Sequence, residues 1–405
     1  MSEITAAGPM RRAWLIDSAD FWRLWSVGLV VFTVRWVETV AVGVFVYQRT
    51  GSAFLVAMMT MLRLLPMGLF GAFLGAIAER IERRTSMLVV LASMVMTSVT
   101  LATLAYLHEL EVWHLAVASF INGVGWATDN PVRRVMIGEV VGSSQMSTAM
   151  SIDVGANNAS RMIGPTIGGL LLATTGIAGV FTLSVILYGI AALAAWRIRY
   201  RNSFPSAGAD SVLARIAEGL RLVRNDKRLI GTLTVTVIYN VFGWPFTSMV
   251  PVIGQDHLQL GPEGIGILSS MDGIGAFVGA VLMATLCRPV FYHYAYVGGV
   301  LVYMVMLTVF ALVPSPELAA SALLFTGLGG AGFSIMQATL VYLSAPPEMR
   351  SRMLGVLSVC IGVGPVGFVA LGWLADAIGA QWATAATGIT GLCMMVLTRP
   401  LWRAI

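Results

Sequence analysis

Five charged residues lie within stretches of the chain that are otherwise apolar. Three are cations and two are anions: Arg35, Arg63, Arg161, Glu38 and Asp272. Charged side chains inside a membrane are costly and mark sites for substrates, ions or protons. If these five line one cavity, its slight positive bias favours an anionic or metal-chelating ligand, and Glu38 and Asp272 are the candidates for carrying a coupling proton. The alternative is that Glu38 pairs with Arg35 or Arg161 and only fixes the register of the helices.

Aromatic and further polar residues occupy the same stretches and could complete a binding site. Flat rings suit stacking on an aromatic or polycyclic ligand, and arginines add cation–π contacts. The candidate rings are Trp36, Trp126, Tyr239, Phe242, Trp244 and Phe246. Asn157 joins them, because Asp153, Asn157 and Arg161 follow at intervals of four and share one helix face. The alternative for each ring is packing against lipid or a neighbouring helix. For Asp129, a further charged residue, the alternative to a role in the site is an ion pair with Arg133.

The composition places these residues in a membrane protein. Of the 405 residues 57% are hydrophobic and only 11% are charged, with a mean hydropathy of +0.82, whereas a soluble protein carries about 25% charged residues. A spanning helix needs about 20 mostly apolar residues, and division at charges, turns and polar clusters predicts an all-α fold with twelve spans. Their approximate centres are Trp36, Leu65, Val95, Asn122, Ala159, Tyr188, Asn240, Gly275, Tyr303, Gly329, Gly362 and Ile389.

The arginines predict how the chain is oriented. They lie in the N-terminal segment, in alternate connections and at the C-terminus, whereas Arg49 is the single Lys or Arg of the other connections. Basic loops stay on the cytoplasmic side, so both termini are expected in the cytoplasm, with the protein spanning a bacterial inner membrane. Residues 1–20 are polar, and their start, Met-Ser-Glu, lacks the basic residues of a signal peptide, which predicts that the first apolar run is retained as a span.

Short stretches of the first half return in the second half in the same order. Gly71–Ala76 is echoed 204 positions later by Gly275–Ala280, and Gly164-Pro165 is echoed by Gly364-Pro365. Such repeats are typical of membrane proteins built from two similar bundles. We expect pseudo-symmetric six-helix bundles at residues 1–200 and 227–405. A cytoplasmic linker at residues 201–226, with an amphipathic helix, is expected to join them.

The loop between the second and third predicted spans carries the most specific motif. Gly75-Ala-Ile-Ala-Glu79-Arg80-Ile-Glu82-Arg83-Arg84-Thr85 resembles the loop signature of the major facilitator superfamily, with Glu79 in place of the usual Asp and Glu82 in place of a Gly. The resemblance implies that this loop latches the two bundles in the outward-facing state, near the start of the eleventh span. The expected latch residues are Gly75, Glu79, Arg80, Arg83, Arg84, Arg350 and Arg352. Glu79 is expected to pair with Arg350 or Arg352.

Further stretches narrow the resemblance. The fifth span resembles the family's antiporter signature, and small residues there and at its repeat are expected to pack helices closely. These residues are Gly164, Pro165, Gly168, Gly364 and Pro365. In the fourth span Ser119 stands where many family members have an arginine implicated in proton coupling, which speaks against a standard drug–proton antiport. The pattern from Leu213 to Gly279 is similar to the branch that holds the enterobactin exporter and macrolide-efflux proteins.

These expectations lead to one function and three alternatives. The first is a secondary transporter that exports a small siderophore-like, anionic or aromatic molecule by alternating access, coupled to protons. The alternatives are a multidrug efflux antiporter, an importer of siderophores or metabolites, and a membrane scaffold or sensor that does not transport.

The same residues predict few other partners. A small-molecule substrate, protons and the lipid bilayer are expected, without nucleic acid, and the protein is expected to be a monomer. Enzyme activity, cofactors and metal sites are not predicted, because the chain lacks a nucleotide-binding loop, a metal-ligand cluster and a nucleophile–base pair. Cys287, Cys360 and Cys393 lie far apart and form no metal-binding or disulfide pattern.

Overall fold

A computed structural model describes residues 17–78, 82–142, 144–200, 223, 226–346, 349–403 and 405. Within these ranges the regular structure is entirely helical. Most helices are apolar around their whole circumference, which is typical of helices that are surrounded by lipid and by one another. The predicted amphipathic helix of the linker lies outside the described residues, as do Glu79 and Arg80 of the predicted latch.

Five helices form the N-terminal half. They are α1 (Ala19–Thr50), α2 (Ala53–Ala78), α3 (Arg83–Tyr106), α4 (Val112–Val141) and α5 (Met146–Trp196). The 51-residue α5 is two helical segments that meet at Gly176, where the backbone has φ 67° and ψ −173°. A positive φ suits glycine, which has no Cβ to clash with the following carbonyl. The fifth and sixth predicted spans are therefore the two arms of α5.

The C-terminal half begins with a broken helix. The broken helix consists of α7 (Lys227–Ile238), a π-helical turn η1 (Tyr239–Gly243), a 3-10 turn η2 (Trp244–Ser248) and α8 (Val250–Asp256). It is followed by α9 (Pro262–Leu286), η3 (Pro289–Phe291), α10 (Tyr292–Leu312) and α11 (Pro316–Ser344). The chain ends with α12 (Arg350–Ile361), α13 (Gly364–Ile378), α14 (Ala380–Leu397) and the short α15 (Arg399–Trp402).

Nine helical segments of the described chain are long and apolar enough to cross a membrane, and Ala53–Leu69 of α2 is a shorter apolar segment. The predicted centres fall in these segments, with Leu65 in the shorter one, except that Asn122 lies in α4, which is not among them. An all-α membrane fold is thus confirmed. The number of twelve crossings stays a prediction.

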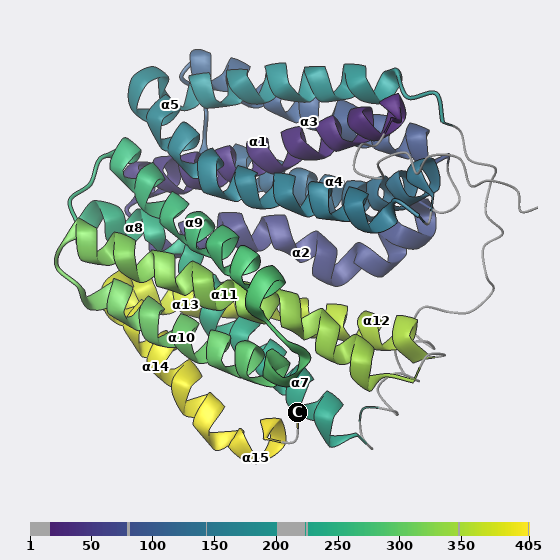
Figure 1. Ribbon diagram of the computed structural model, residues 1–405. Coiled ribbons are helices and arrows are strands. Elements are labelled where there is room, and N and C mark those ends of the chain that lie inside the picture. Colours follow the sequence, from purple (N-terminus) through teal and green to yellow (C-terminus); the bar gives the residue numbers. More distant parts are fainter. Residues whose placement is uncertain are drawn as a thin grey trace, which may run out of the picture.

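The two halves lie against each other with their helices running in roughly one direction. In Figure 1 the N-terminal half, purple to teal, lies above the C-terminal half, green to yellow. We call the end where α3 and α12 begin and α4 ends the arginine-rich end, because Arg83, Arg84, Arg134 and Arg350 lie there. The end with the turns at Gly51, Gly176 and Gly379 is the opposite end.

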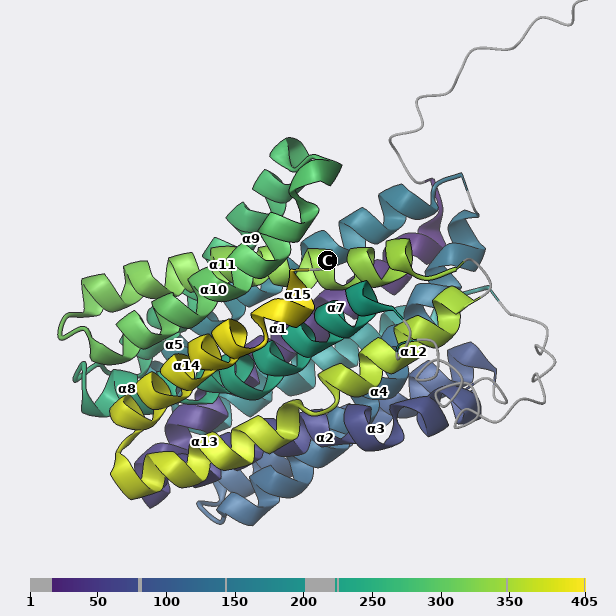
Figure 2. The ribbon, with the colours of Figure 1, turned by 90° about the horizontal axis from the view of Figure 1, so that it is seen from below.

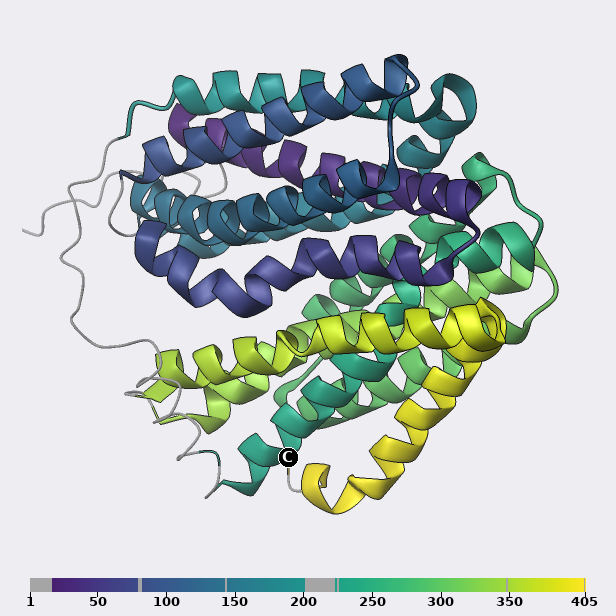
Figure 3. The same cartoon turned by 180° about the vertical axis from the view of Figure 1, so that it is seen from behind.

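Two pairs of helices make the most extensive contact between the halves: α5 packs on α9, and α2 packs on α13. Figures 2 and 3 show α2 and α13 side by side from two further directions. The largest cluster of buried apolar side chains includes residues of both halves, and several of them, such as Ala53, Ile177 and Leu258, lie next to the turns of the opposite end. By contrast, one cluster around Phe21 belongs to the N-terminal half alone and another around Leu229 to the C-terminal half alone.

Candidate functional site

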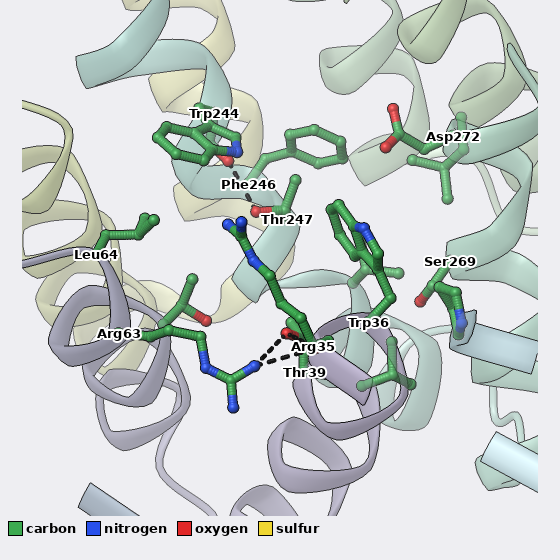
Figure 4. A pocket seen from close by; sticks show the side chains of 15 residues that line it. Arg35, Trp36, Thr39, Arg63, Leu64, Trp244, Phe246, Thr247, Ser269 and Asp272 are labelled. Carbon is green, nitrogen blue, oxygen red and sulfur yellow. Dashed lines mark hydrogen bonds between the residues drawn. The ribbon is translucent and has the colours of Figure 1, made fainter. Parts of the chain in front are cut away.

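A pocket of about 60 Å³ lies between the two halves, with room for several water molecules. Helices α1 and α2 of the N-terminal half form one wall, and η2 and α9 of the C-terminal half form the other, as Figure 4 shows. Its polar and aromatic lining consists of Arg35, Trp36, Thr39, Thr60, Arg63, Trp244, Phe246, Thr247, Ser269 and Asp272. A site between two bundles is where transporters of this architecture bind their substrates.

Arg35 is the residue of this pocket whose charge is not compensated. Its guanidinium lies over the ring of Trp126 at 4.0 Å from the ring centre, with the ring of Trp36 at 5.8 Å. Among the described residues no carboxylate or hydrogen-bond acceptor contacts this guanidinium. Indole faces orient and partly stabilise a cation but do not neutralise it. Arg35 is therefore a cation without an anionic partner among the described residues.

Arg63 and Glu38 form a pair next to Arg35. Arg63 Nη2 donates to Glu38 Oε2 at 3.0 Å, and Asn122 Nδ2 donates to the same oxygen at 3.2 Å. Arg63 Nη1 donates to the carbonyl of Arg35 at 3.0 Å and to Thr39 Oγ1 at 2.9 Å. The alternative that Glu38 pairs with Arg35 or Arg161 is wrong, because Arg63 of the neighbouring helix reaches it.

The other oxygen of Glu38 makes no hydrogen bond of normal geometry. Glu38 is 2% exposed, and its Oε1 has only the nearby hydroxyl of Ser184 as a possible donor among the described residues. A small cavity beside this carboxylate is lined by Asn122, Trp126 and Tyr188 in addition to Arg35 and Arg63. Buried polar atoms are normally paired, and an exception demands an explanation such as an exchangeable proton or water. Glu38 can thus bind a proton without losing its contact with Arg63.

A second ion pair connects the two halves. Arg161 of α5 contacts Asp272 of α9, with 3.1 Å between Arg161 Nε and Asp272 Oδ2. One helical turn further on, Thr166 N donates to Ser270 Oγ at 3.2 Å. The guanidinium of Arg161 also lies 5.6 Å from the ring centre of Trp36. Rotation of one half against the other must break or move this pair.

The irregular backbone of η1 and η2 supplies the aromatic wall. A π-helical turn followed by a 3-10 turn with Pro245 at its start shifts the register of the helix, and such irregular turns are frequent at functional sites. As a result Trp244, Phe246 and Thr247 all face the pocket (Figure 4).

Close packing of α5 on α1 holds Trp36 in place. A Cβ added to Gly164 would lie 2.6 Å from Cβ of Trp36, and one added to Gly168 would lie 2.4 Å from the carbonyl oxygen of Val37. Only glycine permits this approach of the two helices. At the repeat, a Cβ on Gly364 would make an ordinary contact of 3.6 Å with the ring of Trp244.

The remaining predicted site residues lie elsewhere. Tyr239 stacks on Phe333, with ring centres 3.7 Å apart, and Phe242 lines a separate apolar cavity against α13 and α14. Asn157 lines neither of the cavities around Arg35. Short hydroxyl residues of the pocket, such as Thr39, Thr60 and Thr247, were not predicted from the sequence, because isolated threonines in apolar helices carry no distinguishing pattern.

Three of the predicted latch residues contact their own halves. Arg83 of α3 pairs with Glu139 of α4, and Arg84 Nη2 donates to the carbonyl of Trp196 at 2.6 Å. In the C-terminal half, Arg350 Nη1 donates to the hydroxyl of Tyr342 at 3.1 Å. The predicted latch and the pair of Glu79 with Arg350 or Arg352 stay predictions, because Glu79 lies outside the described residues.

A fully buried arginine lies towards the arginine-rich end of the N-terminal half. Arg133 of α4 is 0% exposed and contacts Asp129, at 3.3 Å, and Asp153 of α5. Arg134 Nε lies 3.3 Å from the same Asp153, and its side chain is 40% exposed. The spacing of four predicted the contact with Asp129, whereas nothing in the sequence indicated that Asp153 would join it. No group of three or more metal-ligand side chains occurs in the described ranges.

A helical membrane fold in two similar halves around a charged and aromatic pocket defines a multi-pass membrane transporter. The sequence matches the family model described as transmembrane secretion effector over residues 13–401. The chain therefore belongs to this family of the major facilitator superfamily, and it is a transporter and not an enzyme. The resemblance seen in the sequence is confirmed.

Several characterised relatives are similar over most of the chain. Macrolide efflux protein A of Streptococcus pyogenes is 21% identical over 93% of this chain and 94% of its own length. The multidrug efflux pump Tap of Mycolicibacterium fortuitum is 26% identical over 82% of this chain and 84% of its own length. The staphyloferrin A transporter of Staphylococcus aureus is 20% identical over 92% of this chain and 94% of its own length.

Solved structures confirm the fold. A bacterial homologue of the human lysosomal transporter Spinster, in an inward-facing and unoccupied conformation, superposes with a TM-score of 0.75 at 14% identity, over 96% of this chain and 98% of that one. A POT family transporter in complex with 5-aminolevulinic acid gives a TM-score of 0.73 at 12% identity, over 94% of this chain and 95% of that one. At these identities the likeness concerns the fold alone.

Proposed function

We propose that this transporter exports a small anionic molecule with an aromatic group across a bacterial inner membrane, by alternating access and in exchange for protons. The uncompensated Arg35 in the pocket between the halves carries the proposal. Glu38 balances Arg63 and Asp272 balances Arg161, so the pocket keeps the charge of Arg35. The siderophore-like character of the substrate belongs to this proposal, which the name of the staphyloferrin A transporter supports.

The geometry around Arg35 suggests how such a molecule binds. A carboxylate or catecholate would accept hydrogen bonds from the guanidinium, which are charge-assisted and roughly twice as strong as neutral ones. The ring would stack between Trp36 and Trp244, which face the pocket from opposite halves. Because both halves would then contact one ligand, its binding would favour a state in which they approach each other.

Glu38 is our candidate for the coupling proton. Its Oε1, which makes no hydrogen bond of normal geometry, accepts a proton, and the loss of its negative charge releases part of the attraction on Arg63. Arg63 then becomes a second cation for the substrate, in the same pocket as Arg35. Asp272 is the second candidate, because its Oδ1 also lacks a partner while Oδ2 holds Arg161.

The orientation and the domain boundaries belong to the same proposal. The arginine-rich end faces the cytoplasm by the positive-inside rule, which puts both termini there and the opposite end outside. Bundles at residues 1–200 and 227–405 with a linker at 201–226 match the change of half between α5 and α7. We expect the protein to work as a monomer, since the pocket is complete within one chain.

Binding to the purified full-length protein tests the role of Arg35. Isothermal titration calorimetry with 2,3-dihydroxybenzoate, its neutral amide and the cation ethidium separates charge from ring stacking. We expect the anion to bind best and Arg35→Gln to weaken it by about 10-fold or more, because a hydrogen bond to a charged group contributes about 1.5–3 kcal/mol. Arg49→Gln, at an exposed arginine in the last turn of α1, is the matched control and should bind as the parent does.

Multidrug efflux is the second candidate. The pocket exposes the rings of Trp36, Trp244 and Phe246, which can stack on many ligands, and two of the relatives above are efflux proteins for drugs. Equal affinity for the anion, the amide and ethidium, with no effect of Arg35→Gln, would overturn the anionic proposal and favour this one. Uptake rather than release by intact cells would favour an importer, and absence of any transport a scaffold.

A further inference from the structure

Hydrogen bonds between the described parts of the two halves lie in the middle and at the opposite end. In the middle they join α5 to α9, through Arg161 and Thr166. At the opposite end they join Tyr47, Ser52 and Phe54 to two aspartates of the C-terminal half. At the arginine-rich end the contacts of Arg83, Arg84 and Arg350 described above stay within one half. The buried clusters of that end are also separate.

Asp376 binds the start of a helix that belongs to the other half. Its Oδ2 accepts from Ser52 Oγ at 2.7 Å, and its Oδ1 accepts from the backbone N of Phe54 at 3.1 Å. The first N–H groups of a helix have no partner within the helix, and the helix dipole favours a negative charge there. The last turn of α13 thus supplies a capping carboxylate to α2.

Asp256 makes the companion contact. The hydroxyl of Tyr47, near the end of α1, donates to its Oδ2 at the end of α8. Between the two aspartates the helices approach closely, since a Cβ on Gly372 would lie 2.8 Å from Cβ of Ala57, and one on Gly43 would lie 3.1 Å from Pro251. The opposite end is therefore closed by interlocking surfaces as well as by hydrogen bonds.

We propose that Asp256 and Asp376 are the gate of the opposite end: they hold the pocket closed on that side, and both contacts break each time the pocket opens there. The proposal rests on the proposed function only in requiring alternating access. In the described chain neither aspartate forms an ion pair. Their partners are hydroxyl and amide donors of half-buried residues, and both aspartates are exposed, so water can replace the carboxylate. Such a gate is specific in geometry but weak enough to open in every cycle.

Thiol labelling measures the gate without any substrate. In a background with Cys287, Cys360 and Cys393 replaced by serine, Thr247→Cys places a reporter in the pocket. A membrane-impermeant maleimide is added to right-side-out or to inside-out vesicles. We expect Asp376→Asn and Asp256→Asn each to speed labelling from the opposite-end side by about tenfold, which corresponds to about 1.4 kcal/mol, and to slow labelling from the arginine-rich side.

A neighbouring carboxylate gives the matched control. Glu317 lies exposed in the first turn of α11, at the same end, and makes no side-chain contact with the N-terminal half. Glu317→Gln should leave both labelling rates unchanged. Unchanged rates in both aspartate variants, or an equal rise in Glu317→Gln, would overturn the proposal.

Cross-linking provides an independent test that does not depend on how well the aspartate variants fold. Ser52→Cys together with Asp376→Cys, joined by a short bifunctional maleimide, should suppress labelling of the reporter from the opposite-end side. Full labelling despite the cross-link would refute the gate. Because these readouts contain no substrate, loss of the gate is distinguishable from failure of the proposal for Arg35.

Discussion

Replacing the buried Arg133 tests whether the charged cluster that it forms between α4 and α5 is structural. Its guanidinium is 0% exposed and its two carboxylate partners are each 1% exposed in their side chains. Removing one partner of a buried pair costs about 3–5 kcal/mol, because the remaining charge stays unpaired in a low dielectric. Arg133→Gln leaves Asp129 without a cation and Asp153 with the half-exposed Arg134 alone, so we expect a loss of about 3 kcal/mol in the free energy of unfolding.

Arg134 is the matched control on the next position of the chain. It contacts the same Asp153, but its side chain is 40% exposed. Exposed ion pairs contribute about 0–1 kcal/mol, so Arg134→Gln should lose less than about 1 kcal/mol. The assay is equilibrium unfolding in mild detergent micelles titrated with sodium dodecyl sulfate, followed by helical circular dichroism.

A rescue variant separates burial of charge from loss of packing. Arg133→Met combined with Asp129→Asn and Asp153→Asn removes the charges together, and such neutral replacements of buried ion groups are often close to neutral in stability. We expect the triple variant to regain more than half of the loss. Equal losses for Arg133→Gln and Arg134→Gln, or a triple variant less stable than Arg133→Gln alone, would refute the reasoning.

Two further predictions concern α5 and the coupling proton. Gly168→Ala should lose about 1–3 kcal/mol of stability, because its Cβ is too close to the Val37 carbonyl. Gly155→Ala on the same helix has nothing within 4 Å of its Cβ and should gain up to about 1 kcal/mol through its higher helix propensity. The same unfolding assay measures both changes, and a gain in stability at both positions would contradict the close packing. Glu38→Gln should abolish substrate accumulation driven by a pH gradient in proteoliposomes while substrate exchange at equal pH continues. If Asp272→Asn and not Glu38→Gln shows this separation, the proton belongs to Asp272.

The sequence predicted features that are local, and it missed those that depend on how helices meet. Apolar runs located the helices, and the spacing of Asp129 and Arg133 on one helix predicted their contact, because residues four apart share a face. The pair of Arg161 with Asp272 joins residues 111 positions apart, and no spacing rule reaches across two bundles. For Glu38 the sequence offered partners in its own stretch and in the fifth span, whereas the structure brings Arg63 from α2.

The hydroxyl residues of the pocket show a second limit. Thr39, Thr247 and Ser269 each bond to a carbonyl of their own helix, as threonine and serine in apolar helices generally do. Only the three-dimensional structure shows that they also line the pocket. The irregular turns at Tyr239–Ser248 could not be predicted either, because Pro245 indicates a break in the helix but not the π-helical turn before it.

The described carboxylates that join the halves all belong to the C-terminal half. Their donors, Arg161, Tyr47, Ser52 and the backbone of Phe54, belong to the N-terminal half, and the acceptors are Asp272, Asp256 and Asp376. A duplicated chain with symmetric charges would place like groups opposite each other at such an interface. The two copies have instead diverged, so that one supplies donors and the other acceptors. The same divergence leaves Arg35 without an acidic partner in the described parts of either half. In our proposal a substrate anion that binds Arg35 supplies the negative charge that the C-terminal half lacks at this position.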